Sequence, residues 1–207
     1  MMKDGIIIFQ RNYPNIYSVF ESVINELLSE GEKQELFYNL MLAYGLTGNA
    51  TVDFDECFSR LNNMALGRRH PFFEWLVTYW PNNPLLPPCV NELEFSLQNA
   101  NIKFEDKTGT LNKLKENAQF WGKYCELEAA ANFARAGCIV KILHRPQSKD
   151  KYPDLEIEFY SRKINVEVSN RLYMINKNSE INALRNKVED EAEQLPKGGF
   201  NIILFFV

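Results

Sequence analysis

Residues 151–169, KYPDLEIEFYSRKINVEVS, carry the strongest structural signal in this chain. Apolar and polar residues alternate over 154–159 and again over 164–169, with a short turn between the two runs. Strict alternation is typical of half-buried β-strands, because successive side chains point to opposite faces of a sheet. The stretch therefore predicts a β-hairpin with one apolar face and with several acids gathered on the other.

The acids of this hairpin are candidates for a cation site. A turn at 161–162 gives three cross-strand pairs on the acidic face: Glu156 with Glu167, Asp154 with Ser169, and Glu158 with Asn165. Asp154 and Glu167 are then diagonal neighbours, with about 7 Å between their backbones. Two such carboxylates suit one hard divalent cation. A solvated strand face that carries acids without function is the alternative.

The helix expected before the hairpin brings a third acid toward it. Residues 113–137 predict a long helix that ends at Gly137, a natural C-terminal cap. Its apolar stripe at 3–4 spacing is formed by Phe120, Tyr124, Leu127, Ala131 and Ala134. Glu126 lies at the edge of this stripe and is placed to reach the sheet, whereas Glu128 lies on the other flank. An ordinary boundary glutamate is the alternative for Glu126.

The rest of the chain divides into two parts with different patterns. The first part predicts helices at 16–30, 32–46, 54–66 and 71–80, a proline-rich break at 81–90 and a polar connector at 99–110. The second part predicts a strand at 138–144, the hairpin, a charged helix at 178–196 and a strand at 200–207 buried on both faces. We therefore expect a mixed α/β protein with a helical domain at 1–110 and a domain at 111–207 of order αβββαβ around a mixed sheet.

Composition limits the classes of function. The chain has 207 residues and a net charge of −4, and all the excess negative charge lies in residues 1–115, so phosphate binding is expected in the second part. No apolar run approaches the roughly 20 residues that span a bilayer, and no signal peptide is recognisable, which predicts a cytoplasmic protein without a membrane partner. Four separated cysteines and two histidines argue against a disulfide framework or a zinc site.

With these elements in place, the second part resembles the PD-(D/E)XK nuclease superfamily. The matching segments are CELEAAANFARAGCIVKIL, YPDLEIEFYSRKINVEVS and EDEAEQL, within about 113–207. The resemblance implies a restriction-endonuclease-like fold and a phosphodiesterase site that uses Mg²⁺ or Mn²⁺. It implies that Asp154, Glu167 and Glu126 are catalytic metal ligands, with the carbonyl of Val168 as a further ligand, and that Gln194 borders the substrate.

The chain departs from the family pattern at the position of its lysine. That lysine would stand two residues after Glu167, on the same face, where this chain has Ser169. Ser169 would touch the substrate but cannot supply the positive charge that polarises the attacking water. Lys187, on the following helix, is the first candidate to supply it, and Lys163 or Arg171 are others. A solvated lysine in a charged helix is the alternative for Lys187.

The function expected from this resemblance is metal-dependent cleavage of a nucleic-acid phosphodiester, in defence or repair, with DNA favoured over RNA. The helical domain would then bind a protein partner or the substrate, and a homodimer is allowed. The competing expectation is an inactive nuclease fold that serves as a binding or scaffold module, with Ser169 marking the loss of catalysis. His144 and the basic, aromatic stretch at 67–75 are weaker candidates, since a lone histidine is more often structural and such a stretch more often caps a helix.

Overall fold

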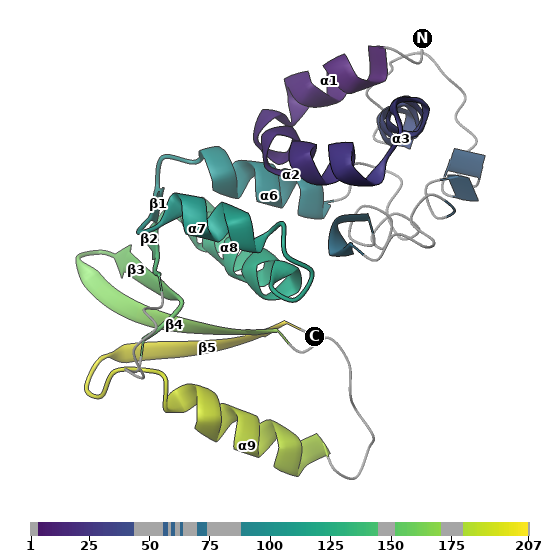
Figure 1. The fold of residues 1–207 in the computed structure, drawn as a ribbon. Coiled ribbons are helices and arrows are strands. Elements are labelled where there is room, and N and C mark those ends of the chain that lie inside the picture. The colour runs from purple at the N-terminus through teal and green to yellow at the C-terminus, as the bar shows by residue number, and fades with distance from the viewer. Residues whose placement is uncertain are drawn as a thin grey trace. The chain divides into compact units, whose positions relative to one another are not determined.

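The computed structural model describes residues 4–43, 56–57, 59–60, 63, 70–73, 88–144, 152–170 and 180–206. Its elements are α1 (Asp4–Asn12), α2 (Pro14–Leu27), α3 (Glu30–Ala43), α6 (Pro88–Gln98), β1 (Ile102–Phe104), α7 (Lys107–Lys113), α8 (Phe120–Arg135), β2 (Ile139–Ile142), β3 (Leu155–Phe159), β4 (Arg162–Asn170), α9 (Glu180–Ala192) and β5 (Phe200–Phe206). The protein is therefore mixed α/β (Figure 1). The predicted helices at 54–66 and 71–80 lie largely outside the described residues, and Arg171 lies wholly outside them.

The chain forms two compact units. The first contains residues 1–95 and 114–120, and the second contains residues 96–113 and 121–207. Residues 96–113 thus belong with the sheet, whereas the expected domain boundary lies at 110. The reason is that Ile102–Phe104 forms a short parallel strand beside β2 and is not the polar connector predicted there.

The helical unit is built around aromatic side chains. Phe9 lies against Phe37 with 5.1 Å between ring centroids, and Phe20 stacks on Phe72 at 4.1 Å. All four are at most 1% exposed. Helices α1 and α3 approach closely at Gly5, where a Cβ would lie 2.9 Å from the α3 backbone, so that a larger residue would force the two helices apart. The predicted helices at 16–30 and 32–46 are confirmed as α2 and α3.

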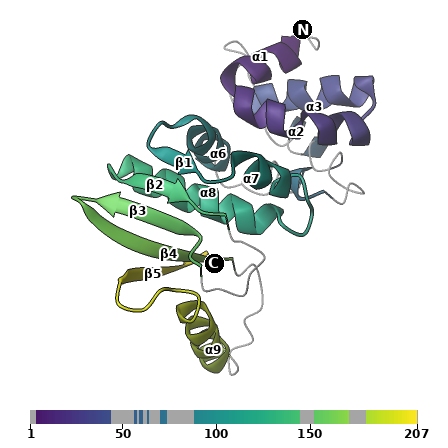
Figure 2. The same cartoon turned by 60° about the vertical axis from the view of Figure 1, so that its left-hand side comes forward.

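The second unit contains one five-stranded sheet in the order β1-β2-β3-β4-β5. Strands β2, β3 and β4 are antiparallel neighbours, while β1 pairs with β2 and β5 pairs with β4 in parallel. The predicted hairpin, and the parallel strand that returns after a helix, are both confirmed. In both views α8 and α9 lie on opposite sides of this sheet, which gives three layers (Figures 1 and 2).

The register of the hairpin differs from the expected one. The turn is formed by Tyr160 and Ser161, with φ of 48° and 61°, as in the two-residue turns that match strand twist. The pairs are shifted by two residues, so Glu156 faces Asn165 and not Glu167. An even shift keeps each side chain on its predicted face. The apolar face is accordingly buried, with Leu155, Ile157 and Val166 at most 1% exposed.

Two other predictions about single elements need correction. The long helix expected at 113–137 is interrupted, because α7 ends at Lys113 and α8 begins only at Phe120. Its predicted end is correct, since Gly137 has a φ of 88°. Strand β5 is not buried on both faces: it is the last strand of the sheet order, and Phe200 at its start is 63% exposed.

The described helices include none with the length and apolar character that crossing a membrane requires.

Candidate functional site

Glu126, the acid predicted from the helix, is held in a largely buried ion pair. Its carboxylate contacts the ammonium of Lys123, which lies one turn earlier on α8, and the two side chains are only 12% and 8% exposed. Lys123 follows from the sequence as an i, i+3 partner, although it does not stand out there. This pair therefore places a compensated negative charge on the helix where the apolar stripe meets polar residues.

The charge of Asp154 acts on Glu126. Burial raises the pKa of Glu126, and the negative charge of Asp154 raises it further, while Lys123 opposes both effects; the result is a pKa of about 7 against an ordinary 4.5. A Coulombic effect of this kind requires the two carboxylates to lie near one another in a poorly solvated place. The structure thus brings together two of the three acids predicted from sequence.

Asp154 is fixed against β4 by its backbone and by its side chain. Its N–H donates to the carbonyl of Val166 at 3.0 Å, and its Oδ2 accepts from the N–H of Val168 at 2.9 Å. Its own carbonyl accepts from the N–H of Leu143 at 2.9 Å. Val166 and Val168 are the residues on either side of Glu167. The aspartate is therefore locked beside the backbone of the third predicted acid.

The side chain of Glu167 lies in a second group of residues, with α9. Glu167 and Ser169 are each 3% exposed, and the side chains of both lie within hydrogen-bonding reach of Glu191, which is 7% exposed. Glu191 also forms an ion pair with Lys187, one turn earlier on α9. Burial acts to raise the pKa of Glu191, but the hydrogen bond and charge of Lys187 and the hydrogen bonds of Ser169 and Glu167 outweigh it, so that this pKa is lowered.

Glu191 is a residue that the sequence analysis missed. Its i, i+4 spacing from Lys187 was the only signal, and such spacing is common on solvated helices. Lys187, the first candidate to replace the family's lysine, contacts Glu191, which also has Ser169 as a side-chain neighbour. Gln194 lies in the turn after α9, where its N–H donates to the carbonyl of Glu191 at 3.0 Å.

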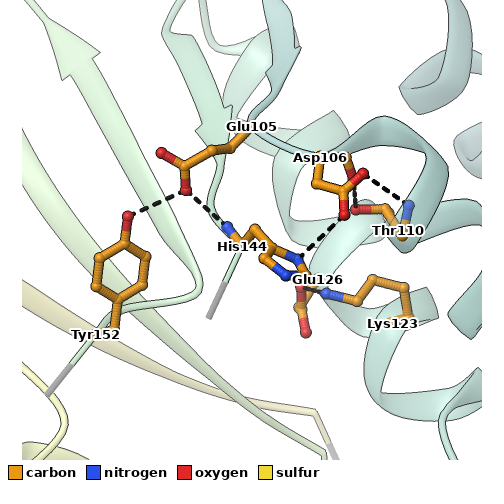
Figure 3. A network of polar contacts seen from close by, with 8 residues as sticks. Glu105, Asp106, Thr110, Lys123, Glu126, His144 and Tyr152 are labelled. Carbon is orange, nitrogen blue, oxygen red and sulfur yellow. Dashed lines mark hydrogen bonds and ion pairs between the residues drawn. The ribbon is translucent and has the colours of Figure 1, made fainter. Parts of the chain in front are cut away.

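A third polar network lies where β1 and β2 end. The carboxylate of Glu105 accepts from the N–H of His144 at 2.9 Å and from the hydroxyl of Tyr152 at 3.0 Å (Figure 3). It also accepts from the ammonium of Lys141 at 3.0 Å. The hydrogen bond from His144, followed by that from Lys141, lowers the pKa of Glu105. Glu105 was not predicted, because its segment was interpreted as a connector. Glu105 thus holds His144 and Tyr152, which both precede Asp154 in the sequence.

His144 also lies near Asp106, with 3.6 Å between its Nδ1 and Oδ2 of the aspartate (Figure 3). Asp106 immediately precedes α7, and its side chain accepts from the N–H of Gly109 at 2.9 Å while its carbonyl accepts from the hydroxyl of Thr110 at the same distance. Asp106 therefore acts mainly as the N-terminal cap of α7. His144, which the sequence suggested as a residue at the end of a strand, therefore has Asp106 as a partner.

The three predicted acids thus lie in two groups, Glu126 with Asp154, and Glu167 with Glu191, which was not predicted; the groups are joined through the hydrogen bond between Asp154 and Val168. Among the described residues, no cluster of three or more His, Cys, Asp or Glu is arranged to hold a metal ion. Comparisons of the chain with protein-family models, curated proteins and solved structures found no match.

Proposed function

We propose that the α/β unit is a metal-dependent nuclease with a PD-(D/E)XK-like core, which cleaves a phosphodiester of DNA in preference to RNA. Support comes first from the element order α8-β2-β3-β4-α9-β5, which is the αβββαβ order of that superfamily. An antiparallel hairpin followed by a parallel crossover strand is the expected sheet arrangement. Fold alone does not define an activity, so the proposal depends on the acids.

The observation that carries the proposal is the electrostatic coupling of Glu126 and Asp154 in a place that water reaches poorly. Two neighbouring carboxylates repel one another there, and a bound cation would relieve the repulsion. The donor set fits Mg²⁺ or Mn²⁺, because Mg²⁺ commonly takes one or two carboxylates and fills its other positions with water and substrate phosphate. Asp154 and Glu126 would hold the ion, with Glu167 as a further ligand.

A bound Mg²⁺ would supply Lewis-acid chemistry, activating a water and stabilising charge on the phosphate. The protein's own part is to orient its ligands. Asp154 is held by two main-chain hydrogen bonds, and its carboxylate is oriented by a third, which it accepts from the N–H of Val168. Lys123 keeps Glu126 in place while partly neutralising it. Preorganisation of this kind lowers the cost of binding the ion.

We assign the role of the missing lysine to Lys187. The family's lysine would stand at Ser169, and Ser169 here hydrogen-bonds to Glu191, which binds Lys187. The link from Lys187 through Glu191 to Ser169 supports this assignment. In this proposal Glu191 is a positioning residue, because it acts on the phosphate only through Lys187. Gln194, in the turn that follows the same helix, would border the substrate.

A second candidate function is favoured by the same contacts. Glu167 and Ser169 are both almost fully buried and both bound by Glu191, which would suit a nuclease fold that has lost catalysis and serves as a binding or scaffold module. In that case the Glu126–Asp154 pair would be a remnant of the site. Cation binding and cleavage separate the two candidates.

The test is calorimetric titration of the protein with Mn²⁺, together with cleavage assays on single-stranded and duplex DNA and RNA in Mn²⁺ and Mg²⁺. We expect Mn²⁺ binding and cleavage, with both lost in Asp154→Ala and cleavage lost in Lys187→Met. Glu158→Gln is the matched control, since it removes an exposed acid from the same hairpin. Mn²⁺ binding without cleavage would favour the second candidate. Absence of binding at millimolar Mn²⁺ would overturn the nuclease proposal.

A further inference from the structure

An exposed aromatic cluster lies at the far end of the hairpin from Asp154. Phe159 is 40% exposed, Tyr160 is 85% exposed and Phe200 is 63% exposed. The rings of Phe159 and Tyr160 are 4.4 Å apart at 68°. Arg162 is the cross-strand partner of Phe159, and its guanidinium lies 5.9 Å from the centre of the Phe200 ring. These four residues, Phe159, Tyr160, Arg162 and Phe200, form one surface, which we call the tip platform.

The turn in the tip platform has a backbone conformation that is unfavourable for its residues. Tyr160 has a φ of 48° and Ser161 a φ of 61°, conformations that favour glycine or asparagine and that strain a bulky side chain. The tyrosine ring gains little from burial to offset this strain, since it is 85% exposed. An exposed aromatic residue in a strained position is more readily explained by binding than by folding.

Charge on the tip platform suits an anionic partner. Cross-strand pairs share a face, so Arg162 lies with Phe159, whereas Glu158 pairs with Lys163 on the opposite face. Lys197, three residues before Phe200, is also exposed. The acids of the hairpin therefore point away from the surface that carries the aromatic rings and Arg162. That separation of charge is local, because the chain as a whole has a net charge of −4.

We propose that the tip platform binds the bases of a single-stranded nucleic acid. Aromatic rings stack on unpaired bases of any sequence, because every base has a π-face, and arginine adds phosphate contact and stacking of its own. Bases within a duplex are already stacked on one another and would not reach these rings. This inference rests on the proposed nuclease function and adds to it a substrate class, a single strand.

The experiment measures fluorescence anisotropy of labelled 12-nucleotide DNA and RNA single strands and of a 12-base-pair duplex, in EDTA so that binding is seen without cleavage. Tyr160→Asn removes the ring and keeps a residue that tolerates the turn, and Phe159→Ala removes the second ring. We expect each to weaken single-strand binding about tenfold and to leave duplex binding unchanged. Ile139→Ala is the matched control, because Ile139 is 43% exposed and pairs with Glu158 on the opposite face.

The possible results distinguish this inference from the nuclease proposal. If the single strand binds and both ring variants weaken it, while Mn²⁺ binding fails, the tip platform stands and the nuclease proposal falls. If the wild type cleaves nucleic acid and the ring variants bind single strands normally, the tip platform is wrong and the nuclease proposal survives. A wild type that sediments as a dimer and becomes monomeric on Tyr160→Asn would also overturn the inference, since the surface would then join two copies of the chain.

Discussion

Glu94 in the helical unit and Glu126 in the α/β unit are both glutamates on helices with little solvent exposure, and their carboxyl groups have opposite surroundings. Glu94 is 4% exposed and lies on α6. Its Oε1 accepts from the N–H and the side-chain amide of Asn15, and its Oε2 accepts from the N–H of Ile16 at 2.9 Å. Helix α2 begins at Pro14, so these N–H groups belong to its first turn and have no partner within the helix.

The carboxylate of Glu94 is thus surrounded by donors and by the positive end of a helix dipole. Glu126 instead has a cationic partner, Lys123, and its pKa is raised to about 7 by burial and by the charge of a second carboxylate, Asp154. A buried acid can therefore stabilise the fold, as Glu94 does, or destabilise it when ionised, as Glu126 does. Acids of the second kind concentrate at functional sites. The contrast between these two glutamates therefore points to Glu126 as the place to test for function.

The largest effect is expected from removing the carboxyl group of Glu94. Glu94→Ala leaves the first N–H groups of α2 without their acceptor in a buried place, and we expect the free energy of unfolding to fall by about 3 kcal/mol. Urea denaturation measures it. Glu94→Gln keeps one acceptor oxygen and should cost less, while Gln98→Ala, at an exposed position of α6, is the neutral control. Equal stability of Glu94→Ala and wild type would contradict a folding role for this acid.

Glu126 should make the metal-free protein less stable as pH rises. Its folded pKa of about 7 exceeds the ordinary 4.5, so the folded state holds this proton more tightly than the unfolded chain. The stabilisation is therefore complete below about pH 4.5 and is lost as pH rises through 7, by roughly 2–3 kcal/mol. Denaturation in EDTA at several pH values measures the slope.

Glu126→Gln should remove this contribution to the slope and should be more stable than wild type above pH 7. Added Mn²⁺ should flatten the slope of the wild type, because a cation stabilises the ionised carboxylate. If Glu126→Gln left the slope of the free energy of unfolding against pH unchanged, burial and Asp154 would not raise the pKa of Glu126.

The ion pair between Lys187 and Glu191 tests whether the second group of acids also depends on a cation. Lys187→Met leaves Glu191 beside Glu167 without its counter-charge, and we expect a loss of about 1–2 kcal/mol in the free energy of unfolding. The double variant Lys187→Met/Glu191→Met should recover most of it, since it removes both charges. Asp190→Asn, on the exposed side of α9, is the control. A double variant no better than the single one would show that the pair is not coupled.

Patterns confined to a few neighbouring residues predicted much of this fold. Alternation over 154–159 and 164–169 identified the hairpin and its faces, because the two-residue period of a strand is visible in the sequence itself. Gly137 was identified as a helix end for a similar reason, and its φ of 88° is one that other residues rarely adopt. Glu126 and Asp154 were found because each lies beside such a pattern.

What sequence reasoning missed depends on contacts between distant residues. The turn at Tyr160 and Ser161 has no residue that favours positive φ, so the register was expected two residues away. Strand β1 has only three residues and exists because β2 pairs with it. Glu191 looks like any acid of a charged helix until α9 packs on β4. In each case the missing information was the identity of the partner.

The smallest effect is expected from Glu105, which adds a third kind of acid to the comparison. Its carboxylate is held by the N–H of His144, Lys141 and the hydroxyl of Tyr152, and its pKa is lowered. The sign is therefore opposite to that of Glu126: the stabilisation is present above the ordinary pKa and is lost as pH falls through the lowered one. Because a third of the side chain is exposed, we expect a contribution of less than about 1 kcal/mol to the free energy of unfolding.

Denaturation between about pH 3 and 6 should show a shallower acid limb for Glu105→Gln than for wild type. If Glu105→Gln instead changed the slope between pH 5 and 8, the assignment of that slope to Glu126 would be wrong, because Glu105 is already ionised throughout that range.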